Sequence, residues 1–243
     1  MIVDLFRSGL TIQEIIYYLI IFLFALTLSF SFHEFMHAAV AVWLGDDTPK
    51  NMGRLTLNPI AHMDPFGTIL LLVAGFGWGK PVVYNPNRLN RFKSHRAMNI
   101  MVHLAGVTGN FILGYLSYVL FIMFASLAVK FSGASFGLNA IAEAFEYTFT
   151  FSMMLLAFNL LPIPPLDGFH VLEELLPYKV RYSEGYRKFQ RISPTIILVV
   201  FLASTFTNIP LLSNLVSAIK TPFVMLINLL ATPFYLLFQV MGL

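Results

Sequence analysis

The chain of 243 residues contains no cysteine, which excludes disulfide bonds and thiolate metal ligands. Any bound metal ion must therefore be held by histidine, aspartate or glutamate. Charge is also scarce, because Asp, Glu, Lys and Arg make up 11% of the residues, against about a quarter in a soluble domain. Hydrophobic residues make up 58% and the mean hydropathy is +0.76. This composition predicts a membrane protein.

The cations are gathered in two loops that lie between apolar stretches. Residues 80–96 carry five Lys or Arg and no acid, and residues 171–191 carry five against three acids. The positive-inside bias places both loops in the cytoplasm and predicts a multi-pass protein of the cell membrane, in contact with the lipid bilayer. The net charge of +3 is explained in this way, so nucleic acid is not expected as a partner. Acidic Asp4 and Glu14 near the first apolar run argue against a cleavable signal peptide.

Apolar runs predict an α-helical polytopic membrane protein with about five to six transmembrane helices. Three runs cover residues 11–44, 97–129 and 140–161, and two shorter runs cover residues 192–206 and 221–240. Between the first two runs, proline and asparagine break helix, and residues 54–57 alternate as a strand does. Residues 66–78 are apolar but too short to cross a bilayer. We therefore expect a short membrane-associated β or re-entrant insert.

We expect one membrane-embedded domain over residues 1–243, because no linker, repeat or soluble segment is visible. Its catalytic core is predicted to cover about residues 11–170, and its C-terminal helices about residues 192–243.

Two histidines four residues apart, with a glutamate beside the first, end the first apolar run as His33-Glu34-Phe35-Met36-His37. On a helix both imidazoles lie on one face, where they can bind a single metal ion. Glu34 lies about 100° round the helix and reaches toward a bound water. Spacing and residue types are those of a zinc hydrolase, which predicts one Zn²⁺ held by His33 and His37.

A catalytic zinc has three protein ligands and an open position, so one ligand remains to be found. Asp167 is the candidate, since it follows three prolines that end the run at residues 140–161. Broken backbone at membrane depth persists only when it is buried in protein or lines a wet cavity. An aspartate there is costly unless it is paired or bound to metal.

The motifs HEFMH, residues 33–37, and NLLPIPPLDG, residues 159–168, together resemble the signatures HExxH and NxxPxPxLDG of the site-2 protease family. These are intramembrane zinc metalloproteases, and residues 45–82 are similar to a compact bacterial branch. The resemblance implies that His33, His37 and Asp167 bind zinc and that Glu34 is the general base. It also implies that Asn159 supports the oxyanion and that Asn110 is a further catalytic residue. Valine stands at position 107, where the family commonly has proline.

Each of these residues also has a structural interpretation that the sequence leaves open. The histidine pair could form hydrogen bonds within a helix interface, and Asp167 could cap a helix. Asn159 could form hydrogen bonds to the broken backbone near Pro162. Asn110 could form a hydrogen bond between helices, beside Gly106 and Gly109, whose spacing suits close helix packing. His170 follows Asp167 closely enough to support a zinc ligand from behind.

The predicted activity is hydrolysis of peptide bonds within or near transmembrane segments of other proteins, with the active site toward the cytoplasm. The alternative is a metal-ion or proton transporter that uses the same histidines and aspartate, although transporters usually distribute polar residues along several spans. A catalytically silent relative that binds membrane partners is a third interpretation. The sequence leaves open whether the protein has a regulatory membrane partner or forms a homo-oligomer. A strand edge at residues 54–57 or 81–84 could bind an unwound substrate by β-strand addition.

Overall fold

The computed structural model describes residues 9–74, 77–131, 133, 135–207 and 211–241. The helices are α2 (Ile12–Trp43), α3 (Thr48–Asn51), α4 (Pro59–His62), α5 (Pro65–Ala74), η1 (Pro86–Arg88), α6 (His95–Lys130), α7 (Ser135–Asn159), α8 (Asp167–Leu175), α9 (Tyr178–Arg181), α10 (Glu184–Thr207) and α11 (Leu211–Val240). Within the described ranges no residue belongs to a β-strand. The prediction of an α-helical membrane protein is confirmed.

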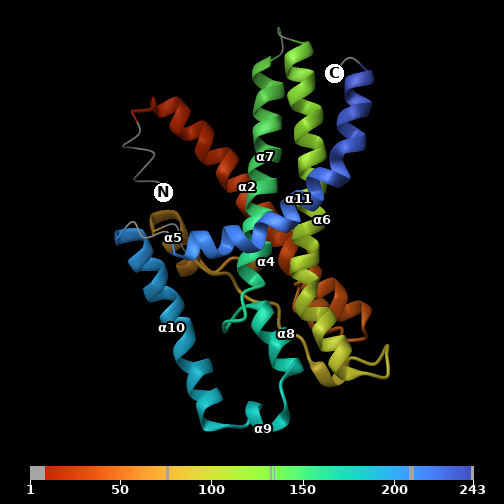
Figure 1. Cartoon of the computed structure of the whole chain (residues 1–243), viewed down its shortest axis with the longest axis vertical. Helices are drawn as coiled ribbons and strands as arrows, with labels where there is room; N and C mark the ends of the chain where they lie inside the picture. The colour runs from red at the N-terminus through yellow and green to blue at the C-terminus, as the bar shows by residue number, and fades with distance from the viewer. Residues whose placement is uncertain (1–8, 75–76, 132, 134, 208–210, 242–243) are drawn as a thin grey trace.

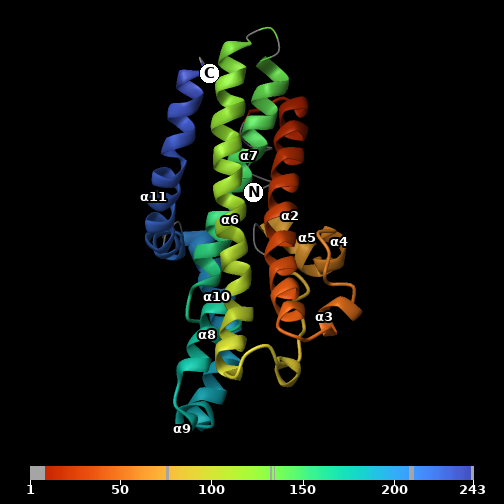
Figure 2. The same cartoon turned by 90° about the vertical axis from the view of Figure 1, so that its right-hand side faces the viewer.

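Helices α2, α6 and α7 form the central bundle, and α11 packs against α6 and α7 (Figures 1 and 2). Their contacts include small polar side chains, as lipid-embedded helices require for close approach. Ser29 of α2 and Ser152 of α7 are both buried, and their hydroxyl oxygens lie 3.1 Å apart. The long apolar helices face lipid on the outside, so the bundle is held by packing and by such hydrogen bonds.

Four helices in the described part of the chain are long and apolar enough to cross a membrane: α2, α6, α7 and Leu212–Val240 of α11. The predicted count of five to six is therefore not confirmed. The run at residues 192–206 forms only the second part of α10, whose first turns carry Arg187, Lys188 and Arg191. These cations leave too short an apolar length for a full crossing. Helix α11 bends in Figure 1 and contains Pro222 and Pro233, each of which removes a backbone hydrogen bond.

The insert between α2 and α6 is built from short helices and turns, so residues 54–57 are irregular and do not form the short β structure that their alternation allowed. Gly53 has a φ of +69°, and Thr56 N donates to Arg54 O, so the chain turns here instead of extending. Asn58 then caps α4 through Ile60 N. The β contact that does form is an isolated antiparallel bridge between Met63 and Gly79. Helix α5 is ten residues long, too short to span, as expected of an interfacial or re-entrant segment.

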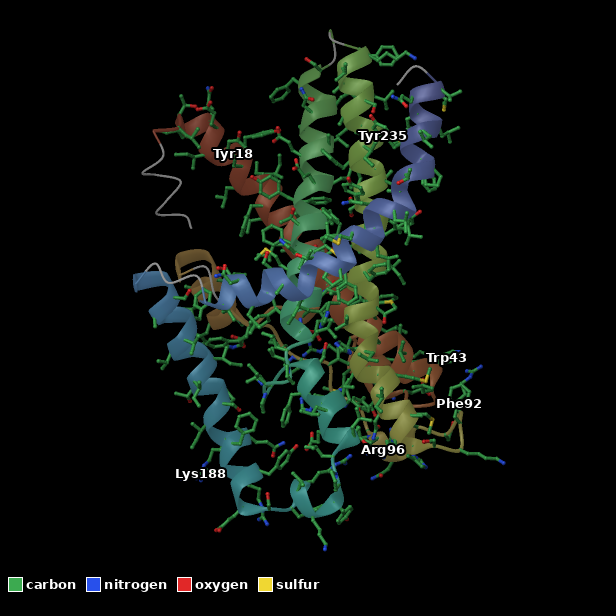
Figure 3. All side chains as sticks on the ribbon, viewed as in Figure 1. Tyr18, Trp43, Phe92, Arg96, Lys188 and Tyr235 are labelled. Carbon is green, nitrogen blue, oxygen red and sulfur yellow. The ribbon has the colours of Figure 1, made fainter. Side chains whose placement is uncertain are left out.

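The two ends of the bundle differ in their aromatic and cationic side chains (Figure 3). Tyr18 and Tyr235 lie toward one end, whereas Trp43, Arg96 and Lys188 lie toward the other. Interfacial aromatic residues at both ends are typical of membrane proteins, and cations concentrate on the cytoplasmic side. Arg96 and Lys188 come from the two different basic loops, so both loops lie at the same end of the bundle.

A buried carboxylate fixes the chain where α2 ends. Asp46 accepts hydrogen bonds from the hydroxyl and backbone N of Thr48 and from the backbone N of Asn85. Burial raises the pKa of the Asp46 carboxyl, but these hydrogen bonds outweigh it and hold the pKa below its ordinary value. Asp46 thereby joins the end of α2 to the segment at residues 80–85, which passes the site described next.

Candidate metal centre

Helix α2 presents the two histidines of the first motif. The helix starts at a capping box, in which Thr11 and Glu14 satisfy each other's backbone N–H groups, and it runs unbroken to Trp43. His33 and His37 are one turn apart and both are buried. His37 lies about 9 Å along the helix from Trp43, so the pair sits below the membrane surface.

Asp167 reaches the histidines because the chain changes direction after α7. Helix α7 ends at Asn159, and α8 begins at Asp167 after a turn that contains three prolines. A Cβ on Gly168 would lie 2.3 Å from Leu160 O, so only glycine lets the start of α8 approach the end of α7 this closely. Asp167 is therefore suited to the site by its chemistry, as a possible metal ligand, and Gly168 by its small size, which lets the two helices come close.

Three ligand atoms converge at this point. His33 Nε2 and His37 Nε2 are 3.1 Å apart, and they lie 3.3 Å and 3.2 Å from Asp167 Oδ2. A tetrahedral zinc ion bound at about 2.0–2.1 Å holds its ligand atoms roughly 3.3 Å apart. The three separations therefore fit three corners of a zinc tetrahedron. Among the described residues this is the group of His, Asp and Glu side chains able to hold a metal ion.

The protonation pattern also suits a cation. His37 Nδ1 lies 2.7 Å from Val102 O, and a carbonyl only accepts, so Nδ1 carries the proton and Nε2 keeps a lone pair. Asp167 Oδ2 is buried and has no hydrogen-bond partner. The Asp167 carboxylate oxygen and the lone pair of His37 Nε2 thus face one point, as a zinc site requires.

Helix α6 forms the other wall of the site through residues spaced by four. Val102 O binds His37, and Asn110 Nδ2 lies 3.1 Å from His33 Nδ1. Between them, a Cβ on Gly106 would lie 2.4 Å from both His33 Cε1 and His37 Nε2. Glycine is therefore needed for α6 to approach the imidazoles. The i, i+4 spacing of these α6 residues was the signal in the sequence that could have identified this wall.

Glu34 is buried beside the histidines on α2, and its Oε2 accepts a hydrogen bond of 3.1 Å from Val82 N. Side-chain exposure alternates over residues 81–84, as in an extended chain, with Val82 and Tyr84 half-buried and Pro81 and Val83 exposed. The segment has no strand partner in the described residues, so its prediction as a substrate-binding edge stays a prediction. Its contact with Glu34 was not predicted from the sequence.

A cavity of about 250 Å³ lies between α2, the insert and the end of α7. Its lining is mostly apolar and includes Phe30, Leu71, Asn159 and Leu166, the last of which directly precedes Asp167. The amide of Asn159 lines this cavity and donates a 3.0 Å hydrogen bond to Leu155 O on its own helix. The oxyanion role of Asn159 therefore stays a prediction.

The structure places the two remaining predicted residues behind the ligands. Asn110 is fully buried and contacts His33, which suits a residue that orients an imidazole. His170 stacks on His103 and approaches Glu173 at 3.4 Å, and within the described part of the chain its side chain makes no hydrogen bond to a candidate ligand. The predicted roles of both residues stay predictions.

The bundle and the site together describe a metal-dependent hydrolase within a membrane protein, and comparison with known proteins gives the same class. Residues 21–204, most of the chain, match the model of peptidase family M50. The chain belongs to this family, the site-2 proteases, and is a zinc metalloprotease of the membrane. The predicted family resemblance is confirmed.

Relatives include YwhC of Bacillus subtilis (strain 168), 45% identical over 157 residues that cover 64% of this chain and 69% of YwhC. Rip2 of Mycobacterium tuberculosis (strain ATCC 25618 / H37Rv) is 31% identical over 207 residues, which cover 82% of this chain and 73% of Rip2. Both are zinc metalloproteases by name. No solved structure matches the chain.

Proposed function

We propose that this protein cleaves membrane proteins within or near their transmembrane segments, with His33, His37 and Asp167 holding one Zn²⁺ and Glu34 acting as general base. The observation that carries this proposal is the convergence of three ligand atoms, 3.1–3.3 Å apart, beside a buried glutamate. The membership of peptidase family M50 and the names of the relatives support the same activity.

When bound, zinc supplies a Lewis acid that polarises the scissile carbonyl and makes the attacking water more acidic. The Glu34 carboxylate takes the proton of that water and passes it to the leaving amine. Val82 N–H, bound to one oxygen of Glu34, holds the carboxylate in place. Asn110 and Val102 O orient the imidazoles from behind.

The substrate reaches the site as an unwound segment, because the peptide bonds of a helix are occupied by internal hydrogen bonds. The apolar cavity lined by Phe30 and Leu71 accommodates a hydrophobic side chain next to the scissile bond. Asn159 on the cavity wall becomes an oxyanion donor if its amide leaves Leu155 O.

The test of this function is Glu34→Gln, assayed with a single-span substrate in liposomes and by zinc content. Cleavage should fall by several orders of magnitude while one zinc ion per chain is retained, because the ligands are unchanged. Wild-type protein without stoichiometric zinc, or full cleavage by Glu34→Gln, would refute the proposal. A metal transporter would instead keep its transport activity in this variant.

We further propose that the site opens toward the cytoplasm, because both basic loops lie at the same end of the bundle as Trp43, which ends the helix that carries His37. The chain has no cysteine, so a single Lys188→Cys substitution gives a label site without background. A membrane-impermeant maleimide should modify it in inside-out vesicles and not in intact cells. The reverse pattern would contradict the orientation.

A further inference from the structure

The candidate ligand Asp167 is carried by a short helix that packs against α6 in a regular pattern. Helix α8 is nine residues long, and it runs beside the half of α6 that contains His95 (Figures 1 and 2). Three levels follow one another, each with one residue from α8 and one from α6. Asp167 and Gly106 both lie against the His33 and His37 rings, His170 stacks on His103, and Glu174 accepts a hydrogen bond from Asn99. The steps of three and four residues are the same on both helices, so each series lies on one helix face.

At the first level both helices meet the same two imidazoles. Asp167 Oδ2 lies 3.2 Å from His37 Nε2, and a Cβ on Gly106 would lie 2.4 Å from that atom. A small shift of α8 along or away from α6 therefore changes the geometry of all three ligand atoms. Metal coordination tolerates errors of only about 0.2 Å in ligand distance.

At the second level the rings of His103 and His170 are stacked, with centroids 4.9 Å apart and planes 20° apart. The lone pairs of nearly parallel rings do not aim at one point, so this pair is a packing contact and not a second metal site. Tyr84 OH lies 3.0 Å from His103 Nε2 and sets that ring's orientation. Glu173 Oε2, at 3.4 Å from Nδ1, approaches the His170 ring.

At the third level Asn99 Nδ2 donates to Glu174 Oε1 at 3.1 Å. Arg181 Nη2 donates to the other carboxylate oxygen at 3.3 Å, and the Arg96 guanidinium donates to Glu174 O. Charge-assisted hydrogen bonds thus hold the far end of α8 on α6.

We propose that His103 and His170 are positioning residues for the zinc ligand: their stacked rings set the separation of α8 from α6 and hold Asp167 at ligand distance. Gly168 sets the approach of α8 to the end of α7, and the levels that follow Asp167 set the separation of α8 from α6. Substituting a residue that orients a metal ligand typically weakens metal binding by about 10–100-fold. This inference rests on the proposed zinc site and adds a role for two histidines that are not ligands.

The test compares His170→Ala with His170→Phe, and His103→Ala with His103→Phe. Zinc affinity is measured by competition with a chelator, and the ligand geometry by the absorption spectrum of the cobalt-substituted protein. We expect the alanine variants to bind zinc about tenfold more weakly, with an altered cobalt spectrum. The phenylalanine variants keep a stacked ring and should stay within about twofold of wild type. His95→Ala, an exposed histidine on the first turn of α6, is the matched control and should change nothing.

Wild-type zinc affinity in both alanine variants would overturn the proposal. So would phenylalanine variants as weak as the alanine variants, since stacking would then not be the cause. A second readout needs no zinc: Asn99→Cys with Glu174→Cys in this cysteine-free chain reports by a short thiol cross-linker whether α8 remains on α6. His170→Ala should lower the cross-linking yield and His170→Phe should not. If the wild-type protein lacks zinc while the double-cysteine variants give this cross-linking pattern, the proposed function is refuted and the placement of α8 stands.

Discussion

Replacing Gly106 with alanine should separate the two imidazoles from the zinc ion while it leaves the bundle assembled. The new Cβ would lie 2.4 Å from His33 Cε1 and from His37 Nε2, where ordinary contact begins at 3.4 Å. The rings or α6 must therefore retreat by about 1 Å, several times the roughly 0.2 Å that metal coordination tolerates. Overpacking of this kind costs about 1–3 kcal/mol. Because 1.4 kcal/mol is a factor of ten, zinc affinity should fall by roughly 5- to 150-fold.

The assay is chelator competition on purified protein, together with thermal unfolding and cleavage of a single-span substrate at saturating and limiting zinc. Gly114→Ala on the same helix is the matched control. Its Cβ would lie 2.5 Å from Met153 Cε, the far end of a flexible side chain that can rotate away. The control should keep its zinc affinity and its activity. If Gly106→Ala binds zinc within about twofold of wild type, the close approach of α6 to the imidazoles is wrong.

Three further substitutions test other parts of the site. Asn110→Ala removes the partner of His33 Nδ1 and should weaken zinc binding about tenfold, measured by the same competition; unchanged affinity would leave Asn110 without a supporting role. Asp46→Asn should destabilise the protein near neutral pH, because folding lowers the pKa of the Asp46 carboxyl below its ordinary value of 3.8. Such a carboxyl stabilises the fold above pH 3.8, and this stabilisation is lost as the pH falls through the lower pKa of the folded state. Thermal unfolding between about pH 3 and pH 6 should show the two proteins converging at the acid end, and a constant difference would contradict this. Leu71→Phe narrows the cavity and should lower kcat/KM about tenfold for substrates with a large apolar residue at the cleavage site, and much less for alanine there; an equal effect on both substrates would exclude the cavity as a specificity site.

Most of what the sequence predicted correctly depends on neighbours in the chain. The capping box at Thr11 and the apolar run behind it predict the first helix, and the four-residue spacing then places His33 and His37 on one face. The prolines before Asp167 predict that a helix breaks there, and α7 does end at Asn159; the ligand role of Asp167 stays a prediction. These features follow from local geometry and from the cost of burying polar groups.

The weaker predictions concern segments whose conformation depends on distant contacts. Alternation at residues 54–57 resembled a strand, but the turn at Gly53 and the cap at Asn58 determine the chain there. The apolar composition of residues 192–206 predicts a span, but these residues continue a helix whose first turns carry cations. Short apolar segments do not distinguish strand, spanning helix and interfacial helix, because the same composition suits each of them.

The sequence by itself determined the chemical types and the membrane setting of this protein: two imidazoles and a glutamate on one helix, and a second carboxylate at a helix break. Only the tertiary structure decided that Asp167 lies 3.2 Å from His37 across 130 residues of chain, that Gly106 makes room for the imidazoles, and that His103 stacks on His170. The physical reason is that spacing along a helix is set by its local geometry. The approach of two helices is set by the shapes of all the side chains between them.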